Sequence, residues 1–247
     1  MNAPVTAPCG TWSSPITAAR VAAGVRPVSA PRLVGDRVLW LQSLPEEGGR
    51  MAVATAGGVL TPAPFNVRTR VHEYGGGAYA AAGDMVWFSN FADNLVYAQQ
   101  GDAAPVAITA EGSQRHADLE LDARHKRLIA IREQHVEGAE ARNTIVALRL
   151  DGSGSATLVE GADFYASARV SPEGRRLAWL SWNHPNMPWH GTQLWLAAFA
   201  DDGSLVHSRC VAGGPSESLC QPVWAPDGKL HVAVSYTHLT LPTIYSV

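Results

Sequence analysis

The feature that most constrains the fold is the stretch of residues 165–214, in which four short apolar segments are separated by turns or longer connections. Leu, Val, Trp and Tyr are frequent in the segments 165–170, 176–182, 193–199 and 206–211. The sequences Ser-Pro-Glu-Gly and Asp-Asp-Gly favour tight turns, because Pro presets φ and Gly accepts a positive φ. Four antiparallel strands in a stretch of this length make one blade of a β-propeller.

A turn followed by a short apolar run recurs along the chain. The turn residues Asp36, Asp84, Arg124, Gly174 and Gly228 follow one another at steps of 40 to 54 residues. A repeat of this length, built from strands rather than helices, is typical of a propeller. We therefore expect an all-β fold, a β-propeller of about four and a half blades. A generic β-sandwich with coincidental spacing is the alternative.

Three parts are expected along the chain. Residues 1–30 are predicted to be a leader with one short helix, for which Thr17 is the candidate N-cap and Gly24 the candidate stop. Residues 31–234 are predicted to form the propeller domain. Its blades are expected at 31–64, 78–110, 115–161 and 165–214, with a fifth begun at 218–234. Residues 235–247 do not continue the pattern. We interpret them as a foreign tail, so the propeller is expected to be incomplete.

Composition excludes several classes of protein. A net charge of −3 and the absence of a large basic cluster argue against nucleic-acid binding. No apolar run approaches the length of a membrane span, and the N-terminus does not resemble a signal peptide. The three cysteines are too few and too irregular for a disulfide framework or a zinc site. We therefore expect a cytoplasmic protein with no nucleic-acid or membrane partner, and we expect its eight tryptophans to fill the core between blades.

Several longer motifs resemble the prolyl oligopeptidase family of serine peptidases, in the branch of the dipeptidyl aminopeptidases and acylaminoacyl peptidases. The most distinctive are His-Glu-Tyr-Gly-Gly-Gly at 72–77 and Asn-His-Pro-Asn-Met-Pro-Trp at 183–189. The resemblance covers nearly the whole chain, in the segments 12–17, 60–77, 88–91, 162–171, 181–195 and 221–228.

The resemblance implies a seven-bladed propeller that caps a C-terminal α/β-hydrolase domain in cis. That domain would carry a Ser-Asp-His triad and hydrolyse short peptides. The propeller would restrict access to the triad. The printed sequence contains no Gly-x-Ser-x-Gly nucleophile elbow, so we expect the catalytic domain to be missing and this chain to be inactive by itself. The alternative is a non-enzymatic propeller that serves as a binding module. The signatures of WD repeats and the secretory signal of Tol-type propellers are absent from the sequence.

The candidate substrate-binding residues lie mainly in the segment 65–77, which interrupts the blade repeat. Its three glycines suit a tight bend that presents His72, Glu73 and Tyr74 toward a cavity. A buried carboxylate at Glu73 could bind the α-amino group of a peptide, or it could pair internally with Arg68 or Arg70. His72-Glu73 does not indicate a zinc site of the His-Glu-x-x-His type, because Gly76 occupies the place of the second histidine. The three glycines also disfavour the helix that such a site requires.

A second candidate lies in the long connection 183–191, where Asn186 could contact a substrate or could belong to a loop packed on the propeller. The expected substrate-binding set is therefore His72, Glu73, Tyr74, Arg70 and Asn186. No catalytic residue, metal or cofactor is expected in this chain.

Overall fold

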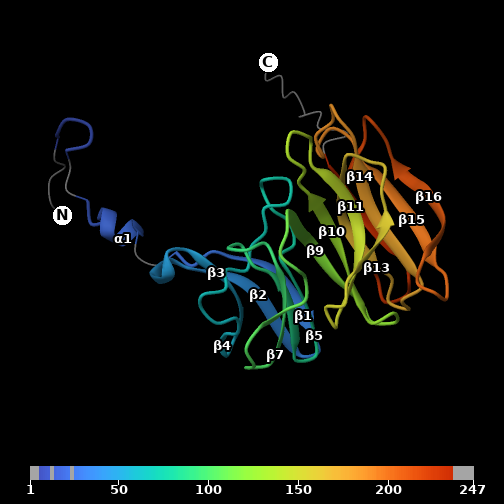
Figure 1. The fold of residues 1–247 in the computed structure, drawn as a ribbon. Helices are drawn as coiled ribbons and strands as arrows, with labels where there is room; N and C mark the ends of the chain where they lie inside the picture. The colour runs from blue at the N-terminus through green and yellow to red at the C-terminus, as the bar shows by residue number, and fades with distance from the viewer. Residues whose placement is uncertain (1–5, 12–13, 23–24, 236–247) are drawn as a thin grey trace, which may run out of the picture.

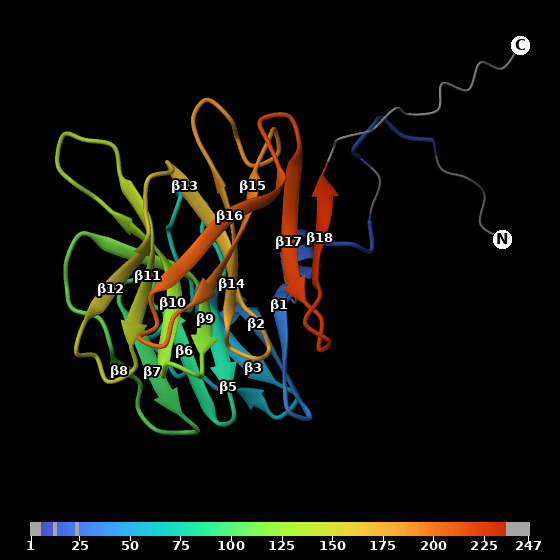
Figure 2. The same ribbon diagram turned by 90° about the vertical axis from the view of Figure 1, so that its right-hand side faces the viewer.

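The computed structural model describes residues 6–11, 14–22 and 25–235, which form the antiparallel sheets of a β-propeller. Four sheets have four strands each, and a fifth has two, as the repeat predicts. In each sheet the strands are hydrogen-bonded in chain order, so every blade is a simple meander. The blades follow one another side by side (Figures 1 and 2).

The strand bounds agree closely with the apolar segments of the sequence. The first blade contains β1 (Val28–Val34), β2 (Arg37–Leu44), β3 (Arg50–Thr55) and β4 (Gly58–Val59). The second contains β5 (Tyr79–Ala82), β6 (Met85–Ser89), β7 (Val96–Gln100) and β8 (Val106–Ala107). The third contains β9 (Gln114–Asp122), β10 (Arg127–Gln134), β11 (Arg142–Arg149) and β12 (Ser155–Val159). The fourth contains β13 (Phe164–Val170), β14 (Arg176–Trp182), β15 (Gln193–Phe199) and β16 (Leu205–Gly213). The fifth pair is β17 (Ser218–Trp224) and β18 (Leu230–Ser235).

The first strand of each blade contacts the first strand of the next, which places these strands together near the axis. Four of them are interrupted by a bulge, and each bulge contains a residue with positive φ: Ala30, Asp118, Ser167 or Gln221. A bulge bends a strand and takes one residue out of the ladder. At the bulge of β9, the Asp118 carboxylate accepts hydrogen bonds from the N–H groups of Gly77 (2.8 Å) and Ser167 (2.7 Å). Asp118 thereby links the third blade to the segment before β5 and to the fourth blade.

The core lies between successive blades rather than within one sheet. Separate apolar clusters fill the spaces between the first and second, second and third, third and fourth, and fourth and fifth blades. Trp87 and Trp179 are buried in two of these clusters, as expected for tryptophan. Trp189 departs from that expectation, since about half of its surface is exposed on the loop that follows β14.

The described part of the chain contains two helical elements, the short helix α1 (Ala18–Ala22) and a 3-10 turn at Pro45–Glu47. Thr17 Oγ1 accepts a hydrogen bond from the Arg20 N–H at 3.1 Å, the contact of an N-cap. Gly24 and residues 236–247 lie outside the described residues, so the division into leader, propeller and tail stays a prediction. Within the described ranges, no helix has the length and apolar character that a membrane span requires.

Candidate functional site

The three glycines at 75–77 allow the chain to pass close to β9 of the third blade. A Cβ on Gly76 would lie 3.1 Å from the Ala117 side chain, and one on Gly77 would lie 2.8 Å from Asp118 Oδ1. Gly75 has a φ of +91°, which L side chains rarely adopt. The prediction of a tight bend is thus confirmed, and the bend brings the chain close to its own strand β9.

The turn before these glycines holds two non-glycine residues in the left-handed region, His72 (φ +54°) and Glu73 (φ +64°). The Glu73 N–H donates to Arg70 O at 2.9 Å, which closes the turn. The His72 N–H donates to Glu133 Oε2 at 2.6 Å, and Glu133 lies on β10 of the third blade. Such conformations cost free energy and persist where surrounding contacts enforce them. Here a carboxylate from another blade holds the turn that carries the candidate residues.

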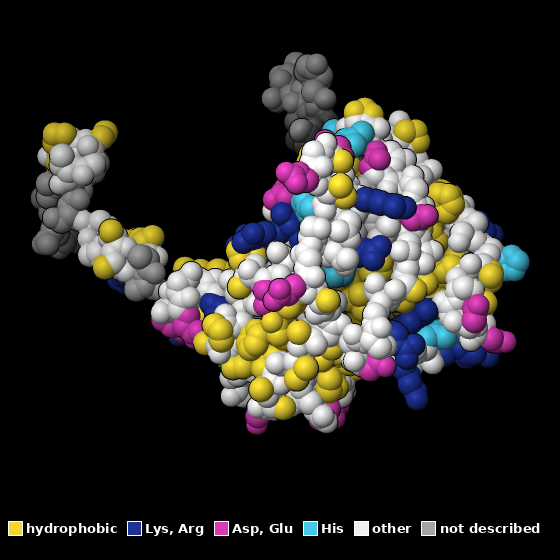
Figure 3. Space-filling view, in the orientation of Figure 1, with side chains coloured by type: hydrophobic (Ala, Val, Ile, Leu, Met, Phe, Trp, Pro, Cys, Tyr) yellow, Lys and Arg dark blue, Asp and Glu magenta, His cyan; other side chains and the backbone are white. Residues whose placement is uncertain are grey.

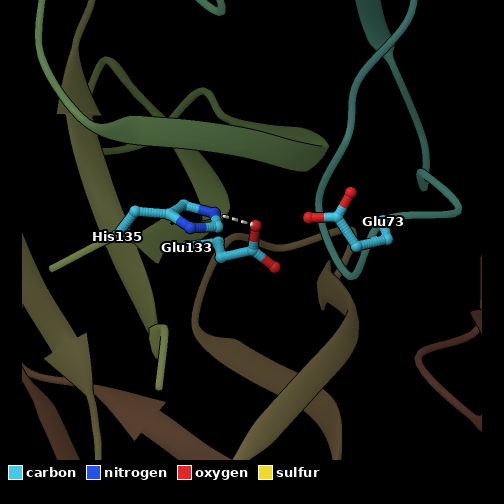
Figure 4. A group of neighbouring side chains, drawn as sticks. All are labelled: Glu73, Glu133 and His135. Atoms are coloured by element: carbon cyan, nitrogen blue, oxygen red, sulfur yellow. Dashed lines mark hydrogen bonds and ion pairs between the residues drawn. The ribbon is translucent and has the colours of Figure 1, made fainter. Parts of the chain in front are cut away.

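Glu73 and Glu133 share one cation, Arg115 of β9. Arg115 Nη1 lies 2.6 Å from Glu73 Oε1 and 3.1 Å from Glu133 Oε1. His135 Nε2 lies 2.6 Å from Glu133 Oε1, and Figure 4 shows Glu73 apart from this pair, projecting from the opposite side. The Glu73 side chain is 76% exposed and that of Glu133 only 5%. The expected buried carboxylate is therefore Glu133 rather than Glu73.

The expected partners of Glu73, Arg68 and Arg70, are not its ion-pair partners. Their guanidinium carbons lie 4.8 and 4.0 Å from the centroid of the Phe91 ring, in cation–π contact. The internal pairing is made by Arg115 instead, because β9 brings that residue beside the turn from the next blade.

The charged groups of this cluster lie close together. The pKa of Glu73 is held below its ordinary value, chiefly by the hydrogen bond from Arg115, so its carboxyl group is ionised at neutral pH. The carboxylates of Glu73 and Glu133 contact the same guanidinium group, that of Arg115. Oxygen and nitrogen atoms of Glu73, Glu133 and His135 lie within 4.8 Å of one another, the reach of a metal site. Arg115, however, is bonded to both carboxylates and already supplies a cation at that place.

An aromatic wall stands beside this charge cluster. The His72 ring lies 5.4 Å from Phe164 and 5.6 Å from Trp182, and the Phe164 and Trp182 rings are stacked. Burial lowers the pKa of His72, so its imidazole is neutral at pH 7. His184 joins the wall from the connection after β14, with its ring 5.0 Å from Phe164.

Tyr74, a residue that is 64% exposed, lines three cavities. The first, of 470 Å³, has Glu73 and Glu133 on its wall together with the aromatic rings. The second, of 390 Å³, lies between the first strands of the third, fourth and fifth blades and is mainly apolar. The third, of 250 Å³, lies on the first-blade side and contains Arg68. On the face seen in Figure 3, basic, acidic and histidine side chains gather over the upper loops.

Asn186 is separate from this group. Its Nδ2 donates to Pro215 O at 3.0 Å, and it lines a different cavity of 290 Å³ beside Gly191 and Gly214. Its amide therefore ties the 183–191 connection to the chain before the fifth blade. The structure brings together His72, Glu73 and Tyr74, and it places Arg70 in the same turn with its guanidinium directed to Phe91.

Sequence reasoning missed Arg115, Glu133 and His135. One signal was present, because Arg115 and Glu133 are directly opposite each other in the β9–β10 hairpin. An acid and a base at opposite positions of two strands are a recognisable cross-strand pair. Their proximity to Glu73 had no local signal, since it depends on the packing of the third blade against the turn.

The comparisons with known proteins point to peptidases. No protein-family model matches the chain, and none of the curated proteins does. Puromycin hydrolase is 36% identical over 93% of this chain, with a TM-score of 0.85, and its mutant has been solved in complex with PGG. A puromycin-hydrolyzing peptidase of Mycobacterium tuberculosis is 37% identical over 94% of this chain, with a TM-score of 0.84. The chain spans 39% of the length of each. Prolyl oligopeptidase B from Galerina marginata, 12% identical over 85% of this chain and 34% of its own, shares the fold with a TM-score of 0.57.

Proposed function

Because the chain is homologous to the propeller region of peptidases of the prolyl oligopeptidase family, we propose that it is the substrate-selecting propeller of a serine peptidase that hydrolyses short peptides. Its partner in cis would be an α/β-hydrolase domain with the catalytic triad, and its role would be to restrict access to that triad. The dipeptidyl aminopeptidase and acylaminoacyl peptidase branch and a cytosolic setting belong to the same proposal. Three free cysteines suit a reducing compartment.

The observation that carries the proposal is the exposed carboxylate of Glu73, which Arg115 holds at the wall of the 470 Å³ cavity. Arg115 contacts the carboxylates of Glu73 and Glu133 together, so a further cation can still bind the open side of Glu73. A peptide α-amino group can donate a charge-assisted hydrogen bond there without displacing Arg115, because most of the Glu73 side chain faces open space. We assign Glu73 the recognition of a free peptide N-terminus.

The aromatic wall supports the same assignment. His72 is neutral and therefore does not repel an incoming ammonium group. Phe164 and Trp182 offer apolar surface to the side chain of the first peptide residue within the same cavity. The relatives named for the hydrolysis of puromycin, and the one solved with PGG, suggest small peptide-like substrates for this chain as well.

Binding of the tripeptide Pro-Gly-Gly to the 247-residue chain, measured by calorimetry, tests the proposal. N-acetylation of the peptide should weaken binding about tenfold, the effect of one lost hydrogen bond to a charged group. The Glu73→Gln variant should bind both peptides equally weakly. Glu137→Gln, at an exposed residue of the neighbouring loop that does not line the cavity, should behave like the parent chain. If N-acetylation leaves the affinity unchanged, or if Glu73→Gln retains the preference, the assignment is wrong.

A further inference from the structure

We propose that Arg68, with Arg70 beside it, binds the carboxylate terminus of the peptide whose α-amino group lies at Glu73. This inference rests on the proposed function and extends it: the propeller would recognise both charged ends of a short peptide. We base this inference on how the two arginines are held, on the lack of an ion pair to either of them among the described residues, and on two cavities that share Tyr74.

The two arginines lie on the same side of an extended segment. From Val67 to Val71, buried and more exposed residues alternate, with Val67, Thr69 and Val71 buried. The segment is anchored by a bridge between Val67 and Asn90 and by the Arg68 N–H, which donates to Ser89 O at 3.1 Å. Alternation of this kind directs residues i and i+2 to one face. The two guanidinium groups therefore share one ring, Phe91, as their support.

Neither guanidinium has an ion-pair partner among the residues that the structure describes. In the part of the chain that the structure describes, neither Arg68 nor Arg70 forms a side-chain hydrogen bond or an ion pair with a carboxylate. Two like charges held near one ring repel each other, and an anion between or beside them relieves that repulsion. The planar fork of a guanidinium matches a carboxylate in a bidentate pair. The chemistry of the pair thus favours a carboxylate ligand.

The cavity beside Arg68 and the cavity beside Glu73 have one lining residue in common. Arg68 lines the 250 Å³ cavity, whose other walls include Leu41, Met51 and Val67. Glu73 lines the 470 Å³ cavity, and Tyr74 lines both. A ligand that extends across Tyr74 from one cavity to the other would have the Glu73 carboxylate at one end and the Arg68 guanidinium at the other. A zwitterionic peptide a few residues long has the complementary arrangement of charges.

The consequence is a preference for short peptides with a free C-terminus. A C-terminal amide removes the negative charge but keeps the size and shape of the peptide. A long peptide would place its carboxylate outside the 250 Å³ cavity. The arginines would then select for both length and free termini, a kind of specificity that Glu73 alone does not provide.

The test compares Pro-Gly-Gly with its C-terminal amide by calorimetry on the 247-residue chain. We expect the amide to bind about tenfold more weakly, again the effect of one charged hydrogen-bonded contact. The double variant Arg68→Gln with Arg70→Gln should bind acid and amide equally, whereas Arg68→Lys with Arg70→Lys should restore part of the preference. Arg175→Gln serves as the control, at an exposed arginine of a distant turn. High salt should reduce the preference of the parent chain, because the contact is exposed.

The two proposals fail in different measurements. If the acid and the amide bind equally well to the parent chain, or if the double Gln variant keeps the preference, the carboxylate site is wrong. The N-acetyl comparison and Glu73→Gln report separately on the amine site. Thermal melts of all variants identify any that fail to fold, and the double Lys variant then carries the comparison. Failure of unmodified Pro-Gly-Gly to bind at all would overturn both assignments.

Discussion

Arg115 Nη1 lies 2.6 Å from Glu73 Oε1, although Arg115 belongs to the third blade and Glu73 to the connection between the first and second blades. The same nitrogen donates to Arg70 O at 3.0 Å, so Arg115 holds both the backbone and the carboxylate of the turn. Because Arg115 also contacts the buried Glu133, the orientation of an exposed candidate ligand group is connected to the interior of the third blade. The exposed carboxylate is thereby held in place rather than left to sample solvent.

Replacement of Arg115 should destabilise the chain. Arg115→Gln leaves Glu133 buried with the His72 N–H and the His135 ring as its remaining described partners. Loss of one member of a buried ion pair typically costs about 3–5 kcal/mol, and the partial exposure of this network reduces the expected loss to about 2–4 kcal/mol. Urea unfolding measures the effect. Glu73→Gln, which removes the exposed end of the network, should leave the midpoint nearly unchanged; equal losses in the two variants would contradict this account.

Gly77→Ala should be harmful for steric reasons. The new Cβ would lie 2.8 Å from Asp118 Oδ1, the same atom that accepts the Gly77 N–H. The Asp118 carboxylate would have to move away from its contacts with both neighbouring blades, at a cost of about 1–3 kcal/mol in the free energy of unfolding. Gly112→Ala is the matched control, since its Cβ would meet nothing within 4 Å. An unchanged unfolding midpoint for Gly77→Ala would show that β9 can move away from the new Cβ without a loss of stability.

Stability should fall in mild acid because of His116. Burial lowers the pKa of His116 from 6.5 to about 4, with a smaller contribution from Arg132. Between these values the unfolded chain binds the proton and the folded chain does not, so the contribution of His116 to stability is complete above pH 6.5 and is lost as the pH falls to about 4. The loss is on the order of 3 kcal/mol.

Unfolding free energies measured across this pH range check the prediction. His116→Gln should remove most of the slope, because the amide does not titrate. His231→Gln, at an exposed histidine, should retain it. If the slope of the His116→Gln variant equals that of the parent chain, another group is responsible for the acid sensitivity.

The strands of the blades could be predicted from local patterns. Residues 176–182 and 193–199 were expected as strands, and β14 and β15 have these bounds. A blade strand is marked by apolar and β-branched residues with Gly, Pro or Asp at its ends, and these signals lie within a few neighbouring residues. The tight bend at 75–77 could also be predicted, because consecutive glycines adopt backbone conformations that other residues disfavour.

The sequence by itself determined the all-β class, the period of the blades and the turn that presents Glu73. Only the tertiary structure decided that Arg115 and Glu133 complete this turn, that Asn186 is bonded to Pro215, and that Arg68 and Arg70 rest on Phe91. The physical reason is the range of the interactions. Strand and turn preferences act between near neighbours in the chain, whereas ion pairs depend on which side chains meet when the blades pack around a common axis. Glu73 and Glu133 are 60 residues apart in the sequence, and the packing of the second and third blades brings them to one guanidinium.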